Sequence, residues 1–510
     1  MKLLTSQQIK DWDAYTMMHE PISSLDLMER AALRCAEEIE RILKTRQMLS
    51  SVMVCCGPGN NGGDGMAIAR LLVQQGIKVA ICMLTAGAKT TADFKTNRQR
   101  IPEGVTVKEI LSKEDIPVIT KNLLVVDALF GSGLNRPPEG LMVMLIDLIN
   151  ESEAYVVAID IPSGLPAEVN DIEEILNHSI VKADCTLTFE VPKKSFMHAE
   201  CHECTGDVNI LDIGLHPQFL PSVPAHHFYI TEPMVKKIVK TRSKFSHKGT
   251  FGHVLIAAGG YGKLGAAILT SKAALRTGCG LLSVFIPKVG YTVMQTALPE
   301  AMVFTDDEVF ELRNFPQTSL YSAVGVGPGI GTGEYTQTGL IQFLNQLHQP
   351  VVIDADALNI IAAILQQADG TFPGQCIITP HPKEFDRLAG HSNNSFERLH
   401  KQRVFAQRYN VVVVLKGAHT SIAMPDGKTY FNSSGNAALA TAGSGDVLTG
   451  IITSLLAQHY TAEEAAIMGV FVHGACADKW VSNGNQTMIA SDIIDMIPQV
   501  LHKLSVDSSG

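Results

Sequence analysis

The sequence has no dense run of lysine or arginine and no long apolar stretch. Its 510 residues carry a formal net charge of -10, whereas nucleic-acid binding needs a clustered basic surface, so nucleic acid is excluded as a partner. No uninterrupted apolar segment reaches the ~18 residues that span a bilayer, and charged residues interrupt the N-terminal segment before an apolar signal region develops. We therefore expect a cytoplasmic protein that has no membrane partner and acts on small molecules. We also expect it to form a homo-oligomer.

The sequence also lacks the paired cysteine motifs of a disulfide framework or a zinc site. Its ten cysteines are scattered, and Cys55 and Cys56 are adjacent within an apolar run, which is typical of reduced thiols in a core. Cys201 and Cys204 form half of a zinc motif, but no second C-x-x-C pair accompanies them. Zinc binding is therefore a minor alternative for this pair.

The length and the pattern of apolar residues predict two α/β domains. A single core stops growing at roughly 250–300 residues, and short β-branched runs alternate here with helical stretches, which favours parallel, doubly wound sheets. The alternation lapses over residues 214–232, which we interpret as a linker between domains 1–220 and 229–505. Ser23 and Asp26 form a capping-box start for the first long helix. The predicted strands are 52–56, 79–84, 123–127, 155–160 and 186–189, then 253–258, 281–286, 323–327, 351–354, 377–379 and 411–415.

Residues 57–65 form a glycine-rich loop of the G-x-G-x-x-G type after the first predicted strand, before a helix expected to begin near Met66. Glycines let the backbone approach a pyrophosphate, and the unpaired N–H groups of a helix start stabilise its charge. A hydride-transferring enzyme would carry an acid at the end of the second strand to hold the ribose, and residues 84–87 contain none. The loop therefore predicts an anionic, nucleotide-like ligand and disfavours ordinary hydride transfer.

Two further predicted strands end in polar residues, at Asp127 and at Asp160. A single aspartate at such a position often only caps a helix. Open parallel sheets, however, bind their ligands at the carboxyl ends of the strands. Three polar strand ends together therefore favour a binding site.

Segments 57–65, 126–133, 160–164 and 188–193 together resemble the NAD(P)HX epimerases. The resemblance implies a potassium ion held by Asn61, Asp127 and Ser163, and ligands that are all oxygen suit a hard cation. Epimerisation needs proton transfer, which makes Asp127 and Lys193 the candidate catalytic groups. The resemblance further implies that the damaged cofactor is bound by Asn60, Asn61, Gly62, Gly63, Asp64, Gly131, Ser132, Gly133, Leu134, Asn135, Arg136, Pro137 and Asp160.

In the second half, Gly443-Ser444-Gly445-Asp446 leads into an apolar helix. Free N–H groups at a helix start stabilise developing phosphoryl charge, and Asp446 is placed to take a proton from a hydroxyl, although a lone aspartate there can also be a simple helix cap. With segments 324–331, 379–385 and 415–420 in this order, the motif resembles the ribokinase-type fold, in which Gly-x-Gly-Asp supplies an anion hole and a base. A Walker A loop is absent, because no Ser or Thr follows Lys263.

Segments 242–253, 273–278, 379–384 and 432–446 resemble the NAD(P)HX dehydratases. The resemblance implies ADP or ATP as phosphoryl donor, magnesium, and the substrates NADHX and NADPHX. Hydroxide is a poor leaving group, so phosphorylation of the hydroxyl would let phosphate depart. The implied nucleotide site is Lys416, Gly417, Ala418, His419, Thr420 and Gly445, and the implied contacts to the damaged cofactor are Ala267, Gly331, His381 and Asp446.

The sequence thus predicts a bifunctional repair enzyme, an NAD(P)HX epimerase fused to an ADP-dependent dehydratase. We expect a Rossmann-like doubly wound sheet followed by a ribokinase-like α/β sandwich. Two alternatives remain open: a ribokinase-like vitamin-precursor kinase with a regulatory N-terminal domain, or a first domain that is a noncatalytic ligand-binding or interaction module. The presence of Asn61, Asp127 and Ser163 disfavours the latter.

Overall fold

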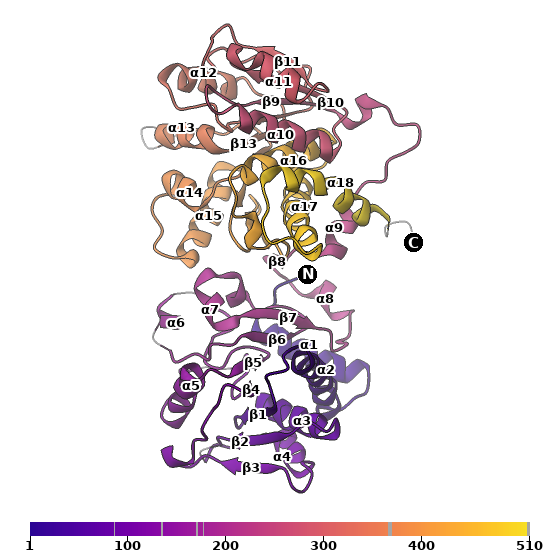
Figure 1. The fold of residues 1–510 in the computed structure, drawn as a ribbon, viewed down its shortest axis with the longest axis vertical. Coiled ribbons are helices and arrows are strands. Elements are labelled where there is room, and N and C mark those ends of the chain that lie inside the picture. The colour runs from indigo at the N-terminus through magenta and orange to yellow at the C-terminus, as the bar shows by residue number, and fades with distance from the viewer. Residues whose placement is uncertain (86, 134–135, 170–171, 177, 366–369, 507–510) are drawn as a thin grey trace. The chain divides into compact units, whose positions relative to one another are not determined.

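The computed structural model describes the whole chain except residues 86, 134–135, 170–171, 177, 366–369 and 507–510. The chain forms two compact units, Lys2–Ala225 with Asn394–Phe396 and His226–Asn393 with Glu397–Gly510 (Figure 1). The first break falls within the segment interpreted as a linker. That segment is nevertheless structured, because it contains a helical turn, α8 (Phe219–Ser222), and a strand, β8 (His227–Tyr229), and ends at the first residue of α9 (Glu232–Ile238).

The N-terminal unit is built on a parallel sheet with the order β3-β2-β1-β4-β5-β6-β7 in the part of the chain described. All five strands predicted here are confirmed, and β3 and β7 are additional strands at its two edges. The strands are β1 (Ser51–Cys56), β2 (Val79–Met83), β3 (Thr106–Glu109), β4 (Leu123–Ala128), β5 (Tyr155–Ile159), β6 (Cys185–Phe189) and β7 (Asp207–Leu211).

Helices cover both faces of this sheet. One core packs α2 and α3 against it and the other packs α5, as Figure 1 shows. Ser23 caps α2 and forms the predicted capping box with Asp26. The helices are α1 (Ser6–His19), α2 (Ser24–Thr45), α3 (Asn60–Gln74), α4 (Ala92–Gln99), α5 (Leu141–Glu151), α6 (Glu173–Leu176) and α7 (His202–Thr205).

The C-terminal unit has a longer sheet with the order β11-β10-β9-β12-β13-β14-β15-β16-β17-β8. Its six predicted strands are confirmed, and only the β15–β16 and β16–β17 pairs are antiparallel among those described. The strands after β8 are β9 (His253–Ala257), β10 (Leu281–Ile286), β11 (Met302–Thr305), β12 (Ala323–Val326), β13 (Val351–Ile353), β14 (Cys376–Ile378), β15 (Val412–Leu415), β16 (Ser421–Ala423) and β17 (Thr429–Phe431).

Two helical layers enclose this second sheet. Buried residues of α10, α16, α17 and α18 form one core, and those of α12, α13, α14 and α15 form the other. No helix among the described residues is both long enough and apolar enough to cross a membrane. The helices after α9 are α10 (Leu264–Thr277), α11 (Tyr291–Ala297), α12 (Glu334–Asn345), α13 (Ala355–Leu365), α14 (Pro382–Ala389), α15 (Ser395–Tyr409), α16 (Ser444–Ala457), α17 (Ala462–Ser482) and α18 (Ala490–Val506).

Candidate functional site

The glycine-rich loop after β1 passes directly into α3, which begins at Asn60 and not near Met66 as the sequence predicted. The glycines belong to the helix because its first turns touch the sheet. A Cβ on Gly62 would lie 1.9 Å from the Gly57 carbonyl oxygen, and one on Gly65 would lie 2.7 Å from Ala128 Cβ. The first N–H groups of α3, which have no intrahelical partner, therefore lie at Asn60 and the residues just after it.

We predict that Gly62→Ala destabilises the N-terminal unit while Gly59→Ala does not. The new methyl at residue 62 would overlap backbone, and such overpacking costs about 1–3 kcal/mol or more. A Cβ on Gly59, by contrast, meets nothing within 4 Å, which makes it the matched control. Thermal unfolding of both variants checks this prediction, and equal midpoints would contradict it.

A cavity of about 830 Å³ lies at the carboxyl ends of the strands of the N-terminal unit. Its wall also includes residues of α1 and α2, among them Asp13 and Met28. The cavity brings together eight residues that the sequence predicted to bind the cofactor: Asn60, Asn61, Asp64, Gly131, Ser132, Gly133, Arg136 and Asp160. Strand ends and the α3 start thus converge on one space large enough for a small-molecule ligand.

The three predicted potassium ligands are connected through one backbone carbonyl, that of Phe130. Asn61 Nδ2 donates to this oxygen at 2.8 Å, and Ser163 Oγ lies 3.3 Å from it. Ser163 Oγ also donates to Asp127 Oδ1 at 2.6 Å, and Ser163 N donates to Oδ2 at 2.8 Å. Asp127 is completely buried, and burial raises its pKa to about 6. The cluster therefore supplies carboxylate, hydroxyl and carbonyl oxygens, which are ligands of hard cations, next to the side-chain amide of Asn61.

Asp127 is absent from the described cavity lining, whereas Asp160 lies on it. Lys193 is only 1% exposed and its Nζ lies 2.6 Å from Asp160 Oδ1, so the lysine predicted to act with Asp127 is paired with Asp160. Asp160 and Glu190, which follow β5 and β6, both have left-handed backbone, with φ of +66° and +57°. This conformation is costly for residues other than glycine and is concentrated at functional sites.

In the C-terminal unit, a second buried polar group surrounds Asp354, the residue after β13. Asp354 Oδ1 lies 3.0 Å from Lys416 Nζ, and Thr449 Oγ1 donates to Oδ2 at 2.8 Å. Lys416 follows β15 and Thr449 belongs to α16, so this carboxylate connects two elements that the sequence predicted to bind nucleotide.

The start of α16 lies next to this group. Gly443 has a φ of +82° and precedes the helix, and a Cβ on Gly445 would lie 3.3 Å from Lys416 Nζ. Asp446 follows in the first turn. Burial, aided by the negative charge of Asp354, raises the pKa of Asp446 to about 6. The helix start, a lysine and an aspartate are thereby assembled as phosphoryl transfer requires.

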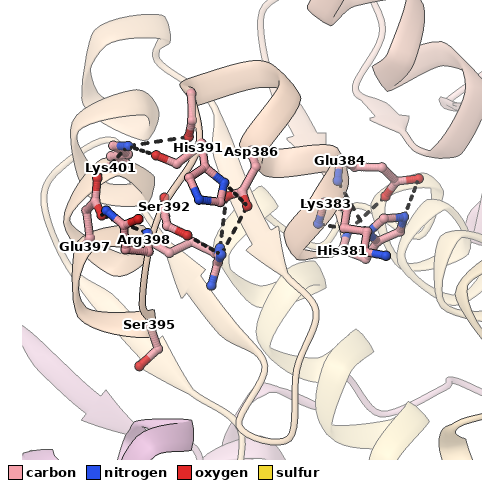
Figure 2. A network of polar contacts seen from close by, with 12 residues as sticks. His381, Lys383, Glu384, Asp386, His391, Ser392, Ser395, Glu397, Arg398 and Lys401 are labelled. Carbon is pink, nitrogen blue, oxygen red and sulfur yellow. Dashed lines mark hydrogen bonds and ion pairs between the residues drawn. The ribbon is translucent and has the colours of Figure 1, made fainter. Parts of the chain in front are cut away.

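His381 has a structural role that the sequence did not indicate: it caps α14 (Figure 2). Its Nδ1 accepts from the backbone N–H groups of Lys383 and Glu384, and Nε2 lies 3.4 Å from Glu384 Oε1. Burial lowers the pKa of His381, which favours the neutral ring, and 44% of the side chain stays exposed. Contact with a ligand through that exposed edge stays a prediction.

Both halves of the chain match known families. Residues 24–195 match the family described as YjeF-related protein N-terminus, and residues 254–499 match NAD(P)H-hydrate dehydratase. A bifunctional NAD(P)H-hydrate repair enzyme from Moorella thermoacetica is 34% identical to this chain, over 99% of this chain and 97% of the relative. The chain belongs to this family.

Solved structures resemble the C-terminal half. An ADP/ATP-dependent NAD(P)H-hydrate dehydratase from Bacillus subtilis, co-crystallised with ATP and Mg²⁺, is 33% identical, with a TM-score of 0.48; the match covers 55% of this chain and 99% of that one. A ribokinase-like superfamily protein from Enterococcus faecalis is 25% identical, with a TM-score of 0.49 and coverage of 55% and 97%. The predicted class, two α/β domains each built on a largely parallel sheet, is that of the chain.

Several predicted binding residues are buried, are absent from the described cavity lining or lie outside the described residues. Leu134 and Asn135 are outside the described residues. Gly62 and Gly63 are buried within α3, and Pro137 is absent from the described cavity lining. Ala267 is fully buried on α10. Ligand contacts at these positions stay predictions.

The remaining predicted residues lie in turns of the C-terminal unit. Gly331 N donates to Asp356 Oδ2 at 2.9 Å, in the turn after β12. The segment from Gly417 to Thr420 is the turn between β15 and β16, where Gly417 N donates to Thr420 Oγ1 and His419 Nδ1 contacts the Asn432 carbonyl. Gly417 and Ala418 are exposed there.

Sequence reasoning missed four polar residues of these two sites: Asp13, Glu190, Asp354 and Thr449. Asp354 ends a predicted strand, so the rule that singled out Asp127 and Asp160 also applied to it. Asp13 gave no local signal, because it lies in an amphipathic segment far upstream of the glycine-rich loop. Thr449 lies inside an apolar helix, where a threonine is unremarkable.

Cys201 and Cys204 are buried free thiols, and burial raises the pKa of both. Across the described residues, no three His, Cys, Asp or Glu side chains are arranged to hold a metal ion. Cys201 and Cys204 are therefore buried free thiols like Cys55 and Cys56 of β1.

Proposed function

We propose that this chain repairs hydrated NADH and NADPH. Residues 1–220 would interconvert R- and S-NAD(P)HX, and residues 229–505 would dehydrate S-NAD(P)HX to NAD(P)H with ADP as phosphoryl donor. The observation that carries the proposal is similarity to a bifunctional repair enzyme over 99% of this chain. The cavity of the N-terminal unit would be the site of the first activity, and the polar group around Asp354 and Asp446 would be the site of the second.

In the dehydratase half, Asp446 would take the proton of the substrate hydroxyl while the hydroxyl oxygen attacks the terminal phosphorus of the nucleotide. The N–H groups of the α16 start and Lys416 would stabilise the transferring phosphoryl group. Phosphate then departs with the carbon–oxygen bonding electrons, and loss of a proton from the adjacent ring carbon forms the double bond of NADH. The net result is removal of water and cleavage of one phosphoanhydride bond.

Magnesium fits the carboxylates of this site. Asp354 and Glu384 are 1% and 6% exposed and lie 3.0 Å and 3.9 Å from Lys416 Nζ, and hard carboxylate oxygens are the ligands that Mg²⁺ prefers. Asp354 and Glu384 would hold the ion, which would neutralise charge on the nucleotide phosphates. We propose ADP as the phosphoryl donor. ATP is the alternative donor, and the assay below distinguishes the two.

Potassium fits the cluster around the Phe130 carbonyl in the epimerase half. Asn61, Asp127 and Ser163 would hold it, and hydrogen bonds already bring Asp127 Oδ1, Ser163 Oγ and the Phe130 carbonyl oxygen together beside the Asn61 amide. The ion would supply fixed positive charge next to the cavity that these residues adjoin. The residues themselves would fix the Phe130–Gly133 backbone as part of the cavity wall.

One assay tests the whole proposal. Purified protein is incubated with mixed NADHX epimers and either ADP or ATP, and recovery of the dihydronicotinamide absorbance is followed. We expect ADP to drive recovery of both epimers with release of phosphate. A phosphorylated product that accumulates without phosphate release would instead support a small-molecule kinase. Recovery limited to the S epimer would contradict the epimerase.

The raised pKa of Asp446 predicts the pH dependence of the dehydratase. A general base must be ionised, so kcat/KM for S-NADHX is expected to be level above about pH 6 and to fall as pH decreases through about 6. Steady-state rates at saturating nucleotide over a pH series check this expectation. A flat profile through this range would contradict Asp446 as the base.

A further inference from the structure

The cavity wall of the N-terminal unit contains an acidic side chain of α1 among mostly apolar neighbours, with Lys10 as the other charged residue that this helix contributes. Ile9, Trp12, Asp13 and Met17 of α1 all line the cavity, at the spacing of one helical face. Asp13 is the polar member of this group. Within the described part of the chain, its carboxylate has neither a hydrogen bond nor an ion pair that would explain its place there.

The helix is fixed on both sides of Asp13. Trp12 Nε1 donates to the His216 carbonyl at 2.9 Å, and His216 N donates to Thr16 Oγ1 at 2.9 Å. Trp12 is 2% exposed and Thr16 is fully buried. These contacts tie α1 to the segment after β7, so the orientation of Asp13 toward the cavity follows from rigid packing and not from a mobile N-terminus.

Asp13 belongs to a charged group in which negative side chains outnumber positive ones. Asp160, Glu190 and Asp64 also line the cavity, and Lys193 is the buried cation near them. Lys193 Nζ forms an ion pair with Asp160 Oδ1 at 2.6 Å, and Lys193 is absent from the described lining. The cations on the described wall, Lys10 and Arg136, are exposed.

This surplus of negative charge affects protonation at Asp13. Burial, followed by the negative charge of Asp160, raises the pKa of Asp13 to about 7, while the charge of Lys193 opposes the shift and that of Glu190 adds to it. Burial also raises the pKa of Asp64 and of Glu190. Glu190 already accepts from the backbone N–H of Ile213 and of Leu215, so it is held by the fold.

We propose that Asp13 is the acid–base group that epimerises the hydrated ring, a proposal that rests on the epimerase activity proposed above. The protonated carboxyl gives its proton to the substrate hydroxyl as the carbon–oxygen bond breaks, and water leaves with the bonding electrons. The lone pair of the neighbouring ring nitrogen forms a carbon–nitrogen double bond. Water then adds to the opposite face, the electrons return to nitrogen, and the released proton passes through intervening water to the carboxylate of Asp13.

The step consumes nothing and leaves Asp13 as it began, as an isomerisation requires. A group that must donate and then accept works best when its pKa is close to the working pH. Asp160 is a poorer candidate for this exchange because Lys193 pairs with it. Asp127 is completely buried and absent from the described lining, so it is a positioning residue in this scheme.

The test compares epimer exchange in wild type, Asp13→Asn and Asp11→Asn. Asp11 lies on the same helix but is exposed and bonded to Gln7, which makes it the matched control. We expect Asp13→Asn to lose about 10²- to 10⁴-fold of the exchange rate above the uncatalysed background. Asp11→Asn is expected to match wild type, and dehydration of pure S-NADHX is expected to continue in all three.

A second measurement separates lost catalysis from lost binding. In a Trp480→Phe background, quenching of Trp12 fluorescence by NADHX reports binding to the cavity beside Asp13. If Asp13→Asn still shows quenching but has lost epimer exchange, the proposal is supported. The pH profile gives further support if wild-type kcat/KM for exchange declines above about pH 7 and Asp13→Glu moves that decline to a different pH.

If Asp13→Asn exchanges epimers at the wild-type rate, Asp13 is not the acid. If quenching disappears together with exchange, Asp13 acts in binding and the proposal is overturned. If wild type shows no exchange above background, the epimerase activity itself fails.

Discussion

Asp446→Asn is expected to reduce nucleotide-dependent recovery of NADH by about 10²- to 10⁴-fold and to leave epimer exchange unchanged. Asparagine keeps the shape of the side chain in the first turn of α16 but cannot take a proton, and loss of a general base has this magnitude. Asp446 also adds negative charge beside Asp354, so its removal is not expected to destabilise the fold. Dihydronicotinamide absorbance with S-NADHX and ADP measures the effect.

The matched control for this change is Asp426→Asn, in the turn between β16 and β17. Asp426 pairs with Lys428 at a half-exposed position in the same unit. Its loss is expected to leave both activities intact. Retention of dehydratase activity by Asp446→Asn would remove Asp446 from the mechanism, and loss of epimer exchange in a folded variant would contradict two separate sites.

Asp127→Ala is expected to have the opposite pattern, with epimer exchange reduced by about 10- to 100-fold and dehydration retained. The carboxylate accepts hydrogen bonds from Leu129 N, Ser163 N and Ser163 Oγ, so its removal disturbs the whole cluster around the Phe130 carbonyl. Mutations that disturb a metal site commonly cost 10- to 100-fold, and each buried donor left unsatisfied costs about 1–3 kcal/mol. We therefore expect a lower unfolding temperature as well.

Potassium titration separates the role of Asp127 in ion binding from its role in folding. Wild-type exchange is expected to rise with potassium chloride added in a choline chloride background, and Asp127→Ala is expected not to respond. Asp207→Ala, at the exposed start of β7, serves as the control for a lost acid in the same sheet. A normal potassium response in Asp127→Ala would exclude Asp127 as a ligand.

The fold was largely predictable because strand pattern is a local property. Each predicted strand had its own run of β-branched residues, and the aspartates that the sequence singled out lie within one residue of the ends of β4 and β5. The missed strands were short or lay at edges: β3 is mostly exposed and β17 has three residues, so neither needs a long apolar run. The start of α3 was missed because glycine-rich segments normally favour loops, whereas here Gly62 and Gly65 let the first turns of the helix approach Gly57 and Ala128 closely.

Candidate site residues that follow a strand end or belong to a local motif could be predicted from the sequence. Residues that reach a site only because distant segments pack together could not. Asp446, Lys416 and Gly445 were found from motifs, and the structure brings Gly445 against Lys416. The pairing of Lys193 with Asp160 and not with Asp127 depends on how neighbouring strand ends align, which no motif encodes. Asp13 reaches the cavity only because α1 packs beside the segment after β7, a long-range contact that periodicity cannot reveal.

The left-handed backbone of Asp160 and Glu190 has a consequence for how this half of the chain can change over time. Each such residue stores about 1–3 kcal/mol of strain, which a glycine at the same position would largely relieve. Glycine would, however, remove a carboxylate from the cavity wall. Selection for thermal stability alone would thus favour glycine at these two positions, whereas selection for catalytic turnover would favour an acidic residue. The residue found at each position in a relative therefore indicates which of the two properties was selected more strongly.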